Sequence, residues 1–138
     1  VNLTIILVRN IVDMYISLKK ARMVGTYTRV DTTVLKIDFN CDEFEEYKKC
    51  IELWRTTAKK EVVKYNIPYI ILKYEDLVSI PVHEQGLYIS SEVGKHSIDL
   101  GHFSIPKNVR PKQDKEVLYE NKIKNYAEFL ECTGQYLI

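Results

Sequence analysis

The opening of the chain constrains the fold most strongly. Residues 3–8 (Leu-Thr-Ile-Ile-Leu-Val) are an almost unbroken apolar run rich in β-branched residues, which is typical of a strand buried on both faces. Polarity changes at Arg9, and Asn10 is a favourable N-cap for a helix whose apolar residues recur at helical spacing from Ile11 to Leu18. This order predicts a strand, a tight turn and a helix. In open α/β sheets ligands bind at the carboxyl ends of strands, and a helix N-terminus there favours an anion.

A second strand is predicted after a long helix. Residues 42–65 carry apolar side chains at steps of three or four, which predicts a helix with one apolar stripe, capped by Asn40 or Asp42. We expect Trp54, which lies on this stripe, to pack in the core. Pro68 ends the helix, and a second apolar run at residues 69–73 predicts another buried strand.

Less can be inferred for the remaining segments. Residues 24–41 have strand-like composition, which fits either a hairpin around Asp31 or a loop. Residues 114–133 predict a closing helix, with Gly134 as its stop signal.

Composition narrows the classes of protein. The chain has 138 residues, 46% of them hydrophobic and 28% charged, which suits one globular domain. Its net charge of +1 gives no broad basic surface for nucleic acid. No apolar run approaches the roughly 20 residues of a membrane span, and we expect no signal peptide. The three cysteines include no CxxC pair, which favours a reduced, cytoplasmic setting while leaving a disulfide between two of them open. The histidines lack metal-ligand spacing, so we expect no metal site.

Two motifs carry a resemblance to a known family. The segment Arg9-Asn10-x-x-Asp13-x-x-x-Ser17 resembles the 3′-phosphate-binding segment of sulfotransferases that use 3′-phosphoadenosine 5′-phosphosulfate (PAPS). One departure is Ile11, where that family usually has proline. The second motif is Tyr74-Glu-Asp-Leu at the end of the second predicted strand, followed by a proline.

The resemblance implies a fold and a set of cofactor contacts. The fold would be an α/β domain with a parallel sheet flanked by helices, similar to P-loop NTPases. Arg9 and Ser17 would hold the 3′-phosphate of PAPS or of its product PAP, because a guanidinium offers forked donors and a hydroxyl adds one more. Tyr74 would pack near the adenine. If the two strands are parallel, Arg9 and Tyr74 leave the sheet at the same edge.

The resemblance also implies what this chain lacks. The family's phosphosulfate loop and its usual catalytic base precede this region, and no Gly-Lys-[Ser/Thr] pattern occurs here. We therefore interpret residues 1–138 as the C-terminal portion of a single sulfotransferase domain, with no catalytic residue of its own. A further family loop that holds the 3′-phosphate has no clear match, since the basic cluster of Lys107, Arg110 and Lys112 lacks its glycines.

The implied activity is transfer of a sulfuryl group from PAPS to a hydroxyl or amine acceptor. The sequence names neither the acceptor nor an oligomeric state. Two other functions fit the same residues. A kinase-like nucleotide-binding half-domain would place Arg9 on an ATP phosphate, and a non-enzymatic interaction module would use the 10 tyrosines at a protein interface.

Overall fold

The computed structural model describes residues 3–26, 30–95, 114 and 116–134, and these form two compact units. One unit comprises Val1–Asn10 with Arg55–Val109, and the other comprises Ile11–Trp54 with Arg110–Ile138. The basic cluster of residues 107–112 lies outside the described residues. The fold is mixed α/β with a small parallel sheet flanked by helices, which confirms the predicted class at that level.

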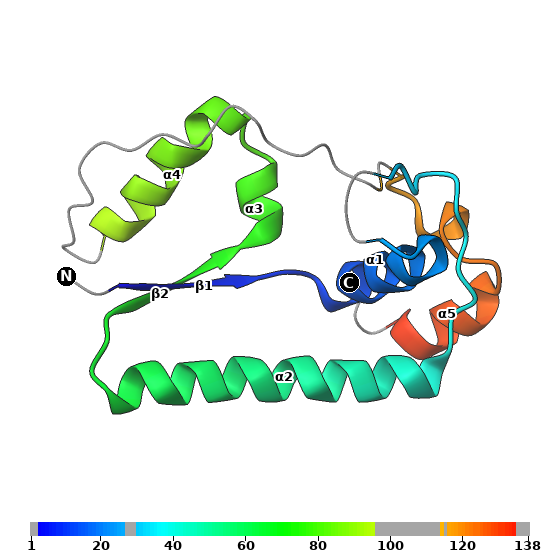
Figure 1. The fold of residues 1–138 in the computed structure, drawn as a ribbon, viewed down its shortest axis with the longest axis horizontal. Coiled ribbons are helices and arrows are strands. Elements are labelled where there is room, and N and C mark those ends of the chain that lie inside the picture. The colour runs from blue at the N-terminus through cyan, green and yellow to red at the C-terminus, as the bar shows by residue number, and fades with distance from the viewer. Residues whose placement is uncertain (1–2, 27–29, 96–113, 115, 135–138) are drawn as a thin grey trace. The chain divides into compact units, whose positions relative to one another are not determined.

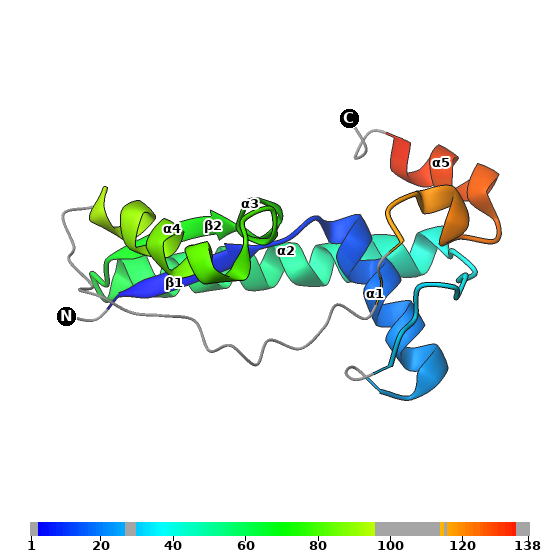
Figure 2. The same cartoon turned by 90° about the horizontal axis from the view of Figure 1, so that it is seen from above.

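The sheet of the first unit contains the two predicted strands. Strands β1 (Thr4–Val8) and β2 (Tyr69–Lys73) lie side by side and pair in parallel along their whole length (Figures 1 and 2). In the described part of the chain this sheet has two strands. The parallel pairing confirms the prediction that both strands end at the same edge, and it requires the long connection that α2 supplies.

Helix α4 (Val82–Gly94), the second helix after β2, packs against one face of the sheet. Helices α3 (Tyr74–Val78) and α4 come directly after β2, and α4 contributes to a core of Ile70, Leu72 and Val93. On β1, by contrast, Ile5 and Leu7 are 43% and 51% exposed, and on β2 Ile71 is 42% exposed. The expectation of two buried strands is therefore wrong for these three side chains, which the described residues leave partly uncovered.

Helix α2 (Cys41–Lys64) is one unbroken helix that begins and ends where the sequence predicts (Figures 1 and 2). The side-chain oxygen of Asn40 accepts a hydrogen bond from the N–H of Glu43 at 3.0 Å, which caps the first turn. The chain leaves the helix through Asn66, whose φ of 52° lies in the left-handed region that asparagine tolerates.

The predicted burial of Trp54 is wrong, because its side chain is 67% exposed. The two most buried positions of α2 are Phe44 and Val62, which point in the same direction because 18 residues make about five turns. At about 100° per residue, Trp54 is displaced from that direction by about 80°, whereas Arg55 lies within about 20° of it. The apolar stripe is thus wider than the buried face.

The second unit is built around aromatic side chains. Tyr15 of α1 (Ile11–Val24) contacts the rings of Phe39 and Phe44 edge-on, with centroids 5.4 Å apart in each case. Edge-to-face contacts of this kind are favourable beyond the area that they bury. The remaining buried members of this core are Val12, Ile16, Ile37, Ile123 and Phe129.

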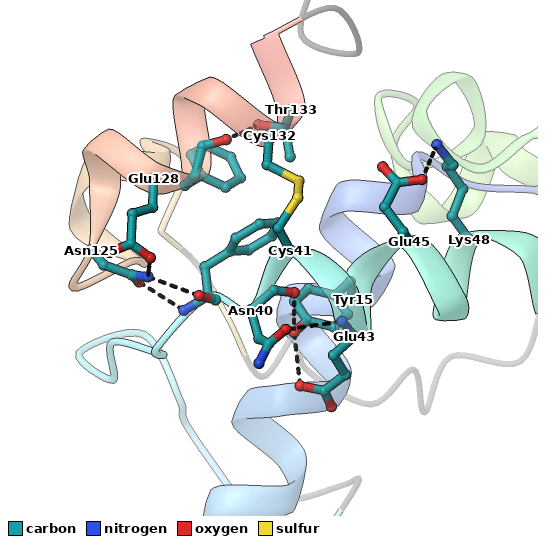
Figure 3. The surroundings of a disulfide bond; sticks show 12 residues. Tyr15, Asn40, Cys41, Glu43, Glu45, Lys48, Asn125, Glu128, Cys132 and Thr133 are labelled. Carbon is teal, nitrogen blue, oxygen red and sulfur yellow. Dashed lines mark hydrogen bonds and ion pairs between the residues drawn. A yellow bond between two sulfur atoms is a disulfide. The ribbon is translucent and has the colours of Figure 1, made fainter.

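A disulfide joins the start of α2 to the last helix. Cys41 is bonded to Cys132 in α5 (Tyr126–Thr133) (Figure 3). Cys50 is free and exposed. The Asn125 side chain lies nearby and pairs with both backbone groups of Phe39, accepting from its N–H at 2.7 Å and donating to its carbonyl at 2.8 Å. The Asn125 hydrogen bonds therefore attach the beginning of α5 to this unit, and the disulfide attaches its end.

The segment from 114 to 133 is less helical than predicted. Its described residues form only the short helix η1 (Tyr119–Asn121) and α5. Between them the backbone of Ile37 bonds to Lys122 and Lys124, forming a parallel bridge opposite Ile123. The N–H of Lys124 bonds to Ile37 and so cannot bond within a helix, which excludes one continuous helix through this point. Residues 30–36 around Asp31 form a loop, and the alternative hairpin would involve residues 27–29, which lie outside the described residues.

Charged side chains are buried beside α1. The ammonium of Lys20, 1% exposed, donates to the carboxylate of Asp114 at 2.9 Å and to the carbonyl of Thr32 at 3.1 Å. Lys122 lies 3.6 Å from the same carboxylate. A buried ammonium requires such partners because its desolvation is costly.

Candidate functional site

Arg9 and Tyr74 meet at the carboxyl end of the sheet. Val8 pairs with Lys73 in the parallel register, so the next residues of both strands leave the sheet together. The guanidinium of Arg9 lies over the ring of Tyr74, with its central carbon 4.7 Å from the ring centroid. This is a cation–π contact, which contributes about 0.5–2 kcal/mol depending on exposure. Two of the three predicted site residues are therefore neighbours.

The peptide group that follows Arg9 is held at both ends. Its carbonyl accepts a hydrogen bond of 2.7 Å from a guanidinium nitrogen of Arg55 in α2. Its N–H, which belongs to Asn10, donates to the carboxylate of Glu75 in α3 at 2.6 Å. Both are short, charge-assisted hydrogen bonds, a stronger class than bonds between neutral groups. We call Arg55 and Glu75 together the peptide clamp.

The third predicted residue belongs to the other unit. Ser17 lies in α1, one turn and a half after the helix begins at Ile11, and its side chain is half-buried. Its pairing with Arg9 on one phosphate is implied by the resemblance to sulfotransferases alone. The roles of Arg9, Ser17 and Tyr74 in binding a cofactor stay predictions.

Charged side chains of both signs gather at this edge of the sheet. Arg9, Arg55 and Lys73 are cationic, and the carboxylates of Glu75 and Asp76 follow in the first turn of α3. The charges of the peptide clamp cancel each other, and each is directed to the end of the peptide dipole that it complements. Arg9 carries a further formal positive charge, and its guanidinium lies against the ring of Tyr74.

Sequence reasoning did not identify the peptide clamp. The sequence pattern gives neither Arg55 nor Glu75 a role in the candidate site. A usable signal exists for Arg55: it lies seven residues before the buried Val62, and positions seven apart share a helix face. No comparable signal exists for Glu75, whose partner is a backbone group 65 residues away.

The described residues were also compared with the requirements of a metal site and of a membrane span. Across residues 3–26, 30–95, 114 and 116–134, no three His, Cys, Asp or Glu side chains come together as a metal-binding group. None of the helices in the described part of the chain is long and apolar enough to cross a membrane.

Comparisons of the chain with protein-family models, with curated proteins and with solved structures give no match.

Proposed function

We propose that this chain is part of a PAPS-dependent sulfotransferase and supplies the side of the cofactor site that binds the 3′-phosphate and the adenine. The observation that supports this most directly is the contact between Arg9 and Tyr74 at the end of two parallel strands. A guanidinium beside an aromatic ring matches a ligand in which a phosphate lies close to a purine ribonucleoside.

The residues present suit one part of PAPS. Arg9 would bind the 3′-phosphate, Ser17 would donate one further hydrogen bond to it, and Tyr74 would contact the adenine. PAPS, when bound, would supply the sulfuryl group, and the three residues named here would act only on its 3′-phosphate and adenine. Binding energy at the remote phosphate would hold the cofactor in place for transfer to a hydroxyl or amine acceptor.

Isothermal titration calorimetry of the 138-residue chain tests this proposal. We expect PAP to bind at least about tenfold more tightly than 5′-AMP or ATP, because a charged phosphate contact adds hydrogen bonds of the stronger class. Arg9→Gln should abolish this preference. Lys73→Gln is the matched control, because it removes one positive charge from the adjacent exposed position at the same sheet edge.

The alternatives give different results in the same titration. ATP binding without preference for a 3′-phosphate would indicate a kinase-like half-domain. Equal, weak binding of all three nucleotides would contradict a nucleotide site and favour an interaction module. An equal loss of preference in Arg9→Gln and Lys73→Gln would show that net charge, and not the Arg9 contact, determines selectivity.

A further inference from the structure

Arg55 and Glu75 hold one peptide group from two different helices, and this geometry has a consequence for Arg9. The carbonyl bound by Arg55 and the N–H bound by Glu75 belong to the same planar unit, between Arg9 and Asn10. Rotation of that plane changes ψ of Arg9 and φ of Asn10 together. The two hydrogen bonds oppose this rotation from both ends.

We propose that Arg55 and Glu75 are positioning residues that hold the Arg9 guanidinium ready for an anionic ligand. This inference rests on the proposed function, because it assigns the clamp to the same 3′-phosphate site. Side-chain rotamers depend on the backbone dihedral angles of their residue. By restricting ψ of Arg9, the clamp restricts the rotamers available to its side chain and favours the one that lies over Tyr74.

The peptide clamp also leaves the net charge of the site unchanged. An Arg–Glu pair is neutral as a whole, and each member is engaged with the peptide group by a bond of 2.7 Å or less. An acidic residue next to a phosphate site would ordinarily repel the ligand. Here the formal charges of Arg55 and Glu75 sum to zero, so the clamp adds no net negative charge beside Arg9.

The test compares selectivity for the 3′-phosphate between clamp variants and matched controls. Affinities of PAP and 5′-AMP are measured by calorimetry for Arg55→Gln and Glu75→Gln. The controls are Lys59→Gln, an exposed cation on the same helix as Arg55, and Asp76→Asn, an exposed acid next to Glu75. We expect the ratio of the two affinities to fall about tenfold in each clamp variant and to stay unchanged in both controls.

Two more variants separate positioning from charge and from simple stabilisation. Arg55→Lys keeps a cationic donor for the carbonyl and should retain most of the selectivity. The double variant of Arg55 and Glu75 should lose no more than either single variant, because both bonds act on one peptide group. Wild-type selectivity in Arg55→Gln and Glu75→Gln, or a double variant that loses the sum of the two, would overturn the inference.

Failure of the proposed function is distinguishable from failure of this inference. If the unmodified chain does not prefer PAP over 5′-AMP, the proposed function is wrong. The clamp is then judged by hydrogen exchange of the Asn10 amide, measured by NMR. Faster exchange in Arg55→Gln and Glu75→Gln than in the two controls would support the clamp, and equal rates in all four would refute it.

Discussion

Removing the disulfide between Cys41 and Cys132 tests how the second unit is stabilised. Cys41→Ser is the cleanest change, because Cys41 is exposed and the new hydroxyl stays in water. The bond links residues 91 positions apart. For a loop of that length the chain-entropy relation gives an unfolded-state entropy loss of about 15.5 cal/mol/K, or about 4.6 kcal/mol at 25 °C. Measured losses for native disulfides are of similar size, about 2–5 kcal/mol.

Hydrogen exchange followed by mass spectrometry measures the effect where it is expected. Amides of α5 (Tyr126–Thr133) should open with a free energy lower by about 2–5 kcal/mol in Cys41→Ser, and reduction of the unmodified chain should reproduce the change. Cys50→Ser is the matched control, because Cys50 is free and exposed. A loss below about 1 kcal/mol would refute the reasoning, since it would mean that the Asn125 contacts with Phe39 suffice to hold this helix.

Three further predictions concern the same unit. Burial, and then a neighbouring carboxylate, raise the pKa of Tyr15 from 10.0 to about 12. Because the folded state holds this proton more tightly, its stabilising contribution is complete below pH 10 and is lost towards pH 12, so alkaline unfolding followed by circular dichroism should begin at higher pH in Tyr15→Phe. Asp114→Asn leaves the ammonium of Lys20 buried without its carboxylate and should lower the free energy of unfolding by about 3–5 kcal/mol in urea titrations; a loss below 1 kcal/mol would show that water reaches this ammonium. Phe44→Ala should cost about 3–5 kcal/mol, whereas Trp54→Ala should change stability by less than about 0.5 kcal/mol, and similar costs would contradict the assigned faces of α2.

The elements that the sequence predicts well are those with a strong local pattern. Strand β2 and helix α2 appear within two residues of their expected bounds, and helix α1 begins at the expected Ile11, because apolar periodicity and a capping asparagine act over short distances. The parallel pairing of the strands also follows, since a long helical connection between two apolar strands favours it.

The predictions that failed depend on packing between distant segments. A periodic stripe shows which side chains are apolar, but it does not show which direction is covered, and so Trp54 was placed in the core. Residues 114–125 have adequate helical composition, yet the bridge between Ile37 and Ile123 fixes a different backbone. The residues of the candidate site also differ in whether a local sequence pattern reveals them. Arg9 and Tyr74 follow from strand ends, whereas Arg55 and Glu75 act on a backbone group that no side-chain pattern reveals.

The disulfide has one further consequence, which follows from where it closes the chain. Every residue of the first unit after Asn10 lies between Cys41 and Cys132 in the sequence. A protease that cuts once within this interval therefore leaves a single covalent molecule of unchanged mass apart from one added water. The two pieces would migrate together on a non-reducing gel and separate only after a thiol is added.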